Sequence, residues 1–165
     1  MIRKAVKQDV EPIMEIIRAT IEEMKSYGNT QWNDRYPLAC DFEKDVENGD
    51  LYVDVAEDGS LAGFVCINSV EPQEYSPMPW KYQGPVLVAH RMAVNPLYRR
   101  KGIGTKLLAF AEQTARDAGA VAVRTDTNSV NAKMNALFCK LGYELVGQIS
   151  LFENPHLFNC YEKRV

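Results

Sequence analysis

The sequence predicts a mixed fold of the α/β (α+β) class, in a single domain that spans residues 1–165. Two short apolar, β-prone segments, 51–56 and 61–68, flank the turn sequence Glu-Asp-Gly-Ser and indicate an antiparallel hairpin. A strand at 86–94, a helix at 105–117 and a strand at 121–125 form a β-α-β unit. Further apolar residues recur at helical spacing before and after these elements. Strands and helices therefore alternate along one chain.

The elements before the hairpin are a strand, a helix and a shorter helix. Residues 2–6 are predicted as the first strand. The next helix begins near Asp9 as its cap, and its buried face consists of Val10, Ile13, Met14, Ile17, Ile21 and Met24. Residues 26–37 break this pattern, and a short charged helix is expected at 41–47.

A long irregular loop and a second set of elements follow the hairpin. The 71–85 segment, rich in proline and aromatic residues, is expected to be a loop. The helix at 105–117 ends at Gly119. A later helix ends at Gly142 and buries Met134, Leu137, Phe138 and Leu141, and the last strands are expected at 143–151 and 158–162.

Composition limits the classes of function. With 46% hydrophobic and 25% charged residues, the 165-residue chain can bury a sizeable core. A net charge of −3 and a pI near 5.5 argue against nucleic acid as a partner. No apolar run approaches the length of a membrane span, and we expect a cytoplasmic protein. Four cysteines without C-x-x-C spacing, and only two histidines, predict reduced thiols and no metal site.

The segment from Val94 to Thr105 is the strongest functional signal. Pro96 ends the strand, three basic residues follow at 99–101, and Gly102 and Gly104 precede a helix. Free amide groups at a helix start, with positive charge beside them, bind phosphate oxygens. The segment therefore predicts a polyphosphate ligand.

The sequence of this turn has three other interpretations. It could be an ordinary strand-to-helix turn with solvated charges. A P-loop needs Lys and then Ser or Thr after its last glycine, but here Thr105 precedes Lys106. A Rossmann turn needs a third glycine where Leu107 stands, although Asp126 lies near the distance of its acidic residue. The Rossmann interpretation is therefore weakened but stays open.

The order of elements and two motifs resemble the GCN5-related N-acetyltransferase (GNAT) superfamily. The first motif is Val94-x-Pro96-x-x-Arg99-Arg100-Lys101-Gly102-Ile103-Gly104, which is similar to the family's acyl-CoA pyrophosphate signature. The second is Asn131-x-x-Met134-x-x-Leu137-Phe138-x-Lys140-x-Gly142-Tyr143. Segments 31–37 and 160–163 also look like a bacterial subgroup whose acceptors are undefined.

The resemblance implies a fold, a reaction and a cofactor site. The fold is a mixed, mostly antiparallel sheet of six to seven strands with about four helices, splayed between the fourth and fifth strands. The reaction is acetyl transfer from acetyl-CoA to a primary amine by direct attack in a ternary complex, with a small-molecule amine as the first candidate acceptor and a peptide amine as the alternative. The residues implied for acetyl-CoA are Met92, Ala93 and Val94 for the pantetheine arm, Arg99, Arg100, Lys101, Gly102, Ile103, Gly104 and Thr105 for the pyrophosphate, and Asn131, Met134 and Phe138 on the later helix.

A general base is needed because only the neutral form of an alkylamine can attack the thioester, and at pH 7 only about one molecule in a thousand is neutral. Asp126, at the end of the fifth strand, is the first candidate, and His90 on the fourth strand is the second. Asp126 could instead be a turn or capping carboxylate, and His90 a structural imidazole.

The chain departs from the family pattern at Phe138, where a tyrosine often donates a proton to the leaving thiolate. Tyr143, Cys139 or water could replace it, or the thiol leaves without acid catalysis because its pKa is low. Phe138 is also the reason to consider a second function, a non-catalytic acyl-CoA-sensing or interaction module.

The acceptor site is expected in the aromatic loops. Trp32, Tyr36, Trp80 and Tyr82 are predicted to line an amine pocket, with Tyr75 nearby, although aromatic residues also anchor long loops. The predicted partners are a small-molecule amine and a second copy in a homodimer, with no nucleic acid and no membrane.

Overall fold

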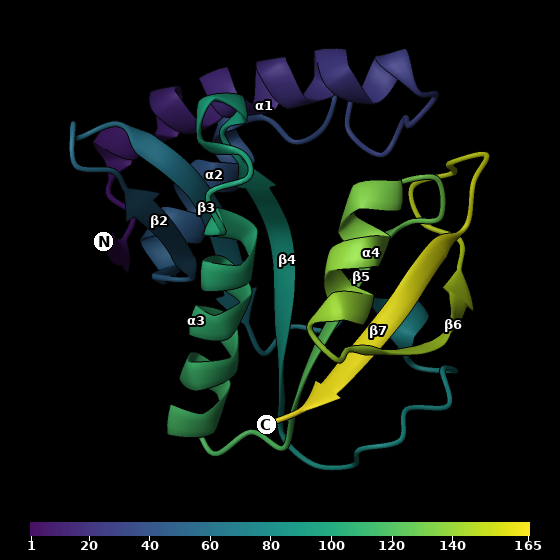
Figure 1. The fold of residues 1–165 in the computed structure, drawn as a ribbon. Helices are drawn as coiled ribbons and strands as arrows, with labels where there is room; N and C mark the ends of the chain where they lie inside the picture. Colours follow the sequence, from purple (N-terminus) through teal and green to yellow (C-terminus); the bar gives the residue numbers. More distant parts are fainter. The chain divides into compact units, whose positions relative to one another are not determined.

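The structure is a computed structural model that describes residues 1–165, and it contains seven strands, four α-helices and three short 3-10 helices (Figure 1). The strands are β1 (Ile2–Lys4), β2 (Leu51–Val55), β3 (Leu61–Asn68), β4 (Val86–Val94), β5 (Ala122–Asn128), β6 (Glu144–Ile149) and β7 (Phe158–Arg164). The helices are α1 (Val10–Ser26), α2 (Ala39–Asn48), α3 (Ile103–Asp117) and α4 (Ala132–Lys140), with 3-10 turns η1 (Lys7–Asp9), η2 (Gln73–Tyr75) and η3 (Pro96–Tyr98). No helix has the length and apolar character that a membrane span requires.

The strands form one sheet in the order β1-β2-β3-β4-β5-β7-β6. The chain divides into two compact units, which are described separately below. Unit 1 contains Met1–Ile67 and Arg91–Leu107, and unit 2 contains Asn68–His90 and Leu108–Val165. The single domain over residues 1–165 stays a prediction.

Unit 1 has its core between α1, α2 and strands β2 and β3. The strands β1, β2 and β3 pair antiparallel. Ile13 of α1, Phe42 of α2 and Phe64 of β3 have no exposed surface, and the Phe42 and Phe64 rings meet edge to face at 5.3 Å. The apolar face predicted for α1 is therefore the face that packs.

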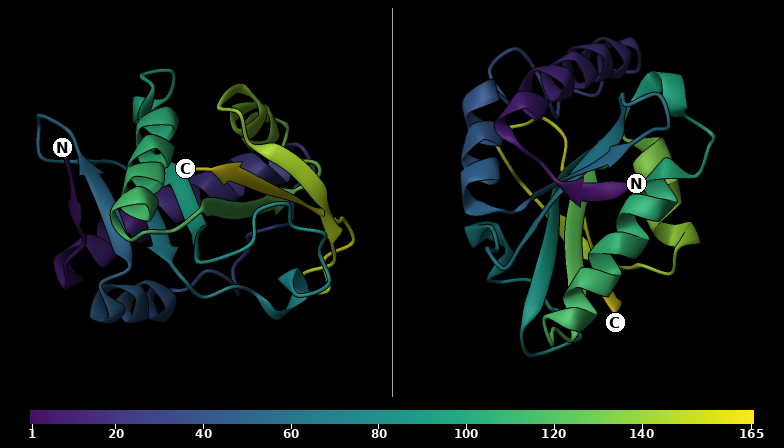
Figure 2. Two further views of the ribbon diagram at one scale, coloured as in Figure 1. Left: turned by 90° about the horizontal axis from the view of Figure 1, so that it is seen from below. Right: turned by 90° about the vertical axis from the view of Figure 1, so that its left-hand side faces the viewer.

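Unit 2 is built on β5, β7 and β6, which pair antiparallel. The 71–85 segment and α4 lie on opposite faces of these strands (Figure 2). Under the segment, Tyr75 and Trp80 pack with Phe158 and Cys160. Under α4, the Phe138 ring contacts Tyr161 and Tyr143, at centroid distances of 5.1 and 5.5 Å.

β4 and β5 pair in parallel over only part of their lengths. Val86–Ala89 pair with Ala122–Thr125, and the Thr125 hydroxyl donates to the carbonyl of Ala89 at 2.8 Å. The pairing stops there, although β5 continues to Asn128. The predicted mixed sheet, the number of helices and the opening between the fourth and fifth strands are confirmed.

Several element boundaries differ from the sequence prediction. α3 begins at Ile103, two residues earlier than predicted, and β1 ends at Lys4. β5 continues three residues past the predicted end because β7 pairs with it as far as Asn128 and Phe158. This cross-strand pairing overrides the low strand propensity of Asp126 and Asn128, so that two further strand residues follow Asp126.

Candidate functional site

The turn between β4 and α3, in unit 1, adopts the backbone shape of an anion site. Asn95 begins it, because its side-chain oxygen accepts from the amide of Leu97 and its amide group donates to the carbonyl of Leu61. Arg100 has φ of 62° and Gly102 has φ of 76°, with Lys101 between them. Such reversals of backbone handedness turn successive N–H groups toward one point.

The amide groups of residues 100–105 donate no hydrogen bond to any acceptor in the protein. The amide of Arg99 donates to Pro96 at 3.4 Å, and the next bonded amide is that of Lys106, which donates to the carbonyl of Gly102 at 2.9 Å. These free donors lie at the N-terminus of α3, where the helix dipole adds positive potential. The turn therefore has the donors that a diphosphate requires.

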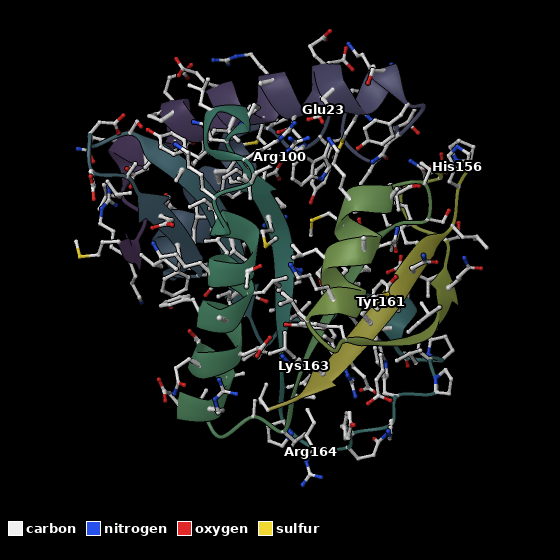
Figure 3. The ribbon with its side chains drawn as sticks, viewed as in Figure 1. Glu23, Arg100, His156, Tyr161, Lys163 and Arg164 are labelled. Carbon is white, nitrogen blue, oxygen red and sulfur yellow. The ribbon has the colours of Figure 1, made fainter.

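The three basic side chains of the turn have different surroundings. The Arg99 guanidinium pairs with Glu23 of α1. The Lys101 ammonium lies 4.9 Å from the centre of the Tyr98 ring. Arg100 is exposed and pairs with no residue of the protein (Figure 3). Arg100 is thus the cation of this turn that is most available to a phosphate.

The hairpin between β2 and β3 braces the same turn. The Tyr98 hydroxyl donates to Asp58 at 2.8 Å and lies 2.5 Å from the Ser60 hydroxyl. Hydrogen bonds from Ser60 and then from Tyr98 lower the pKa of Asp58 to about 2. The carboxylate is thus charged at neutral pH and holds Tyr98, directly before the basic residues.

The predicted pantetheine residues Met92, Ala93 and Val94 form the end of β4 that leads into this turn. Ala93 is buried in the core of unit 1, whereas Met92 and Val94 are half-buried. A Cβ atom on Gly63 would lie 2.8 Å from the carbonyl oxygen of Ala93. Glycine at position 63 therefore lets β3 approach this part of β4.

Asp126, in unit 2, lies on the face of β5 that the 71–85 segment covers. The Tyr75 hydroxyl donates to Asp126 Oδ2 at 2.5 Å, while Oδ1 accepts from no group of the protein. Burial raises the pKa of Asp126 to about 6, the hydrogen bond from Tyr75 opposes this rise, and Glu74 adds to it. A carboxylate with a pKa near neutral and a free oxygen can accept a proton from an amine.

His90 occupies the position on β4 that corresponds in register to Asp126, one residue past the last pair, Ala89 and Thr125. Its Nε2 lies 2.7 Å from Asn68 Oδ1, which also accepts from the amide of Val70. Asn68 Oδ1 is therefore an acceptor, and His90 Nε2 carries a proton. Nε2 is therefore not the nitrogen of His90 that could accept a proton.

The residues predicted on α4 are mostly engaged within unit 2. Asn131 caps the helix through Met134 N at 3.3 Å, and its amide group donates to Thr127 at 3.2 Å. Met134 is half-buried, and Phe138 is buried between two tyrosine rings. Asn131 retains one donor hydrogen and one acceptor lone pair for a ligand.

Tyr143 and Cys139 are the two residues that could protonate the leaving thiolate in place of a tyrosine at position 138. Tyr143 is buried, its hydroxyl has no hydrogen-bond partner, and burial raises its pKa well above the usual value. A phenol with a raised pKa is a weaker acid toward a thiolate. Cys139 is exposed on α4.

The four aromatic residues predicted for the acceptor pocket are divided between the units. In unit 1, Trp32 is buried in the core, and the Tyr36 hydroxyl accepts from Arg91, which pairs with Asp45 at 2.6 Å. In unit 2, Trp80 is buried beneath the Arg124 guanidinium at 4.3 Å, and the Tyr82 hydroxyl donates to Glu144. The two tryptophans therefore pack within cores, and Tyr36 and Tyr82 are half-buried.

The contacts of the candidate site residues that the sequence did not predict include two between distant elements. The bond between Tyr75 and Asp126 joins positions 51 residues apart. The pair of Arg99 and Glu23 joins the turn to α1. Neither pair has a local spacing signal, because both depend on how distant elements meet.

Comparison with known proteins gives the family. Residues 14–143 match the sequence model of the acetyltransferase (GNAT) family. The uncharacterized N-acetyltransferase YesJ of Bacillus subtilis is 25% identical over 147 residues, which cover 87% of this chain and 81% of that protein. Aminoglycoside N(6')-acetyltransferase type 1 of Klebsiella aerogenes is 30% identical over 108 residues, 64% of this chain and 66% of that protein.

A solved structure agrees with this result. The GNAT-family acetyltransferase of Streptococcus agalactiae superposes with a TM-score of 0.86 at 26% identity, covering 100% of this chain and 95% of that chain. The family match spans the β4–α3 turn, β5 and α4, the elements that carry the candidate site residues of both units. The chain belongs to the acetyltransferase (GNAT) family, and it is an N-acetyltransferase.

Proposed function

We propose that the protein transfers the acetyl group of acetyl-CoA to a primary amine of a small molecule, by direct attack in a ternary complex. Acetyl-CoA is the acetyl donor of the family. The observation that carries the proposal is the run of free amide groups at residues 100–105, which extends from the positive-φ Arg100 into the first turn of α3. These amides and the Arg100 side chain would hold the diphosphate of the donor.

The chain's part in the chemistry is proton removal and charge stabilisation. The Asp126 carboxylate takes a proton from the acceptor ammonium, which frees the nitrogen lone pair. The nitrogen bonds to the carbonyl carbon, the C–S bond breaks, and the thiolate leaves and takes up the second proton that the nitrogen loses as the amide forms. A backbone N–H near Met92 or Val94 would stabilise the oxyanion. His90, next in register to Asp126, is the second candidate for the base.

The acidic residues near Asp126 favour a positively charged acceptor. Glu74 on the 71–85 segment belongs to the same unit as Asp126 and acts on its carboxyl electrostatically, whereas the charge of Glu71 is paired with Arg124. Acidic groups near a base favour a cationic amine. The similarity to an aminoglycoside N(6')-acetyltransferase points the same way, toward a polyamine-like or amino-sugar acceptor. Tyr36 and Tyr82 remain candidates for contact with it.

The oligomeric state and the cellular location are predicted from the sequence. β6 is an edge strand with Leu145 exposed, and the homodimer stays a prediction that light scattering can check. The cytoplasmic location also stays a prediction.

Release of the CoA thiol in the presence of a panel of amines tests the proposed function. We expect thiol release that depends on the acceptor, is fastest with cationic amines, and falls at least a hundredfold in Asp126→Asn. Binding of acetyl-CoA without any acceptor-dependent release would favour the non-catalytic module instead. Activity that persists in Asp126→Asn would move the base to His90.

A further inference from the structure

Tyr75 is held in one orientation inside unit 2. Its side chain has no exposed surface. The indole N–H of Trp80 donates to the Tyr75 carbonyl at 2.9 Å, and the two rings lie 4.9 Å apart. Tyr75 also ends the 3-10 turn η2, where its amide donates to the carbonyl of Pro72. The phenol therefore has little freedom to turn away from its partner.

That partner is one oxygen of Asp126. The hydroxyl donates to Oδ2 at 2.5 Å, and no other group of the protein donates to this carboxylate. Oδ1 is thus left with its lone pairs open, on a residue that is half-buried. A rigid donor on one oxygen fixes the plane of the carboxylate and the direction of the other oxygen.

The position on the sheet distinguishes this contact from an ordinary buried hydrogen bond. Asp126 is the first β5 residue beyond the pairing with β4, where the two strands no longer bond to each other. A buried phenol can be satisfied by any carbonyl, whereas a partly buried carboxylate costs free energy. The proposed role of Asp126 as the base explains why a carboxylate lies at this position of β5 despite that cost.

The groups that surround Asp126 are few. The 71–85 segment contributes Tyr75 and Glu74, and β7 contributes Cys160, which is paired with Asp126 in register. On β4, His90 lies at the register position that matches Asp126. Arg124 lies two residues before Asp126 on β5, and its charge is paired with Glu71 at 3.0 Å. Burial and Asp126 itself raise the pKa of Tyr75 well above its usual value, and burial, with a smaller contribution from Asp126, raises the pKa of Cys160. Tyr75 therefore keeps its proton while Asp126 gains or loses one.

We propose that Tyr75 is a positioning residue for acetyl transfer, whose hydroxyl holds Asp126 Oδ2 so that Oδ1 meets the ammonium of the acceptor. The inference rests on the proposed function, because it assumes that Asp126 is the base. Tyr75 acts only through Asp126 and exchanges no proton with the substrate.

The pH dependence of kcat in Tyr75→Phe tests this role. Without the donor, the carboxylate holds its proton more tightly, so the acidic limb of the profile moves up by about one pH unit. We expect kcat to fall about tenfold at pH 7 and KM for acetyl-CoA to change less than twofold. The matched control is Tyr161→Phe. Tyr161 is a buried tyrosine on β7 (Figure 3), and its hydroxyl donates to Asn135 at 2.6 Å. It should leave the acidic limb in place.

The double variant separates this inference from the proposed function. If Tyr75 acts through Asp126, adding Tyr75→Phe to Asp126→Asn lowers kcat no further. A wild-type pH profile in Tyr75→Phe, with Asp126→Asn inactive, would overturn the positioning role alone. An active Asp126→Asn would overturn the proposed base, and the inference with it.

A second substitution covers the case in which Tyr75→Phe fails to fold. 3-Fluorotyrosine placed at position 75 keeps the ring and is a stronger hydrogen-bond donor. The acidic limb should then move to lower pH, the opposite direction from Tyr75→Phe. A limb that stays in place would contradict the proposal.

Discussion

At the scale of single residues, the molecule places its charged groups in two distinct ways. Arg91 and Asp45 pair directly at 2.6 Å, so each compensates the burial of the other. Asp126 has only a neutral phenol as partner. Its charge is therefore poorly compensated, which is a cost to stability that the proposed role of Asp126 as the base would explain.

This cost predicts how Asp126→Asn changes stability. A carboxyl whose pKa is raised on folding, here to about 6, stabilises the folded state fully below the unfolded pKa near 3.8 and loses that contribution as pH rises through 6. Asn keeps an oxygen for the Tyr75 hydroxyl and has no charge. The variant should therefore be more stable than wild type above pH 6, by at most about 3 kcal/mol.

Urea unfolding at pH 4 and pH 8 measures this difference. The gain should be small at pH 4 and level off above pH 7. Asp34→Asn, at an exposed position, is the control and should change stability by less than about 0.5 kcal/mol at either pH. A variant that is less stable than wild type at pH 8 would show that the Asp126 charge is compensated after all.

At the scale of elements, the β4–α3 turn depends on its backbone conformation more than on space. A Cβ atom on Gly102 would meet no atom within 4 Å, but φ of 76° is strained for alanine. Gly102→Ala should cost about 1 kcal/mol of stability and weaken CoA binding about tenfold, because relaxing the strain reorients the free amides.

Gly119 supplies a matched control for that substitution. It has φ of 71° and equally open surroundings, and it lies at the other end of α3. Gly119→Ala should lose similar stability in urea unfolding and keep its affinity for CoA in titration calorimetry. Equal affinities in both variants would contradict the assignment of the turn.

Elements with local sequence signals could be predicted, whereas contacts between distant elements could not. The hairpin, β4 and the turn at 94–105 carry local signals, namely turn residues, alternating apolar positions and clustered glycines, and all are found where predicted. The extension of β5 to Asn128 depends on pairing with β7. The partners of Asp126 and Arg99, Tyr75 and Glu23, come from elements distant in sequence, so periodicity could not reveal them.

At the scale of the whole molecule, ligand binding should raise the melting temperature. Acetyl-CoA at one hundred times its Kd adds about 2.7 kcal/mol to the free energy of unfolding. For a chain of 165 residues this raises Tm by about 5–10 °C. S-Acetylpantetheine, which lacks the diphosphate, should give a much smaller shift at the same concentration. Equal shifts would show that the turn does not hold the diphosphate.

The two compact units each draw on two separate stretches of chain, and this has a consequence for synthesis on the ribosome. Unit 1 lacks part of its structure until Leu107 has emerged, although its first stretch ends at Ile67. Unit 2 needs both Asn68–His90 and Leu108–Val165, so it forms only after the second of these stretches has emerged. A nascent chain that pauses after the hairpin therefore exposes an unfinished core, and chaperone contacts should concentrate on that interval of translation.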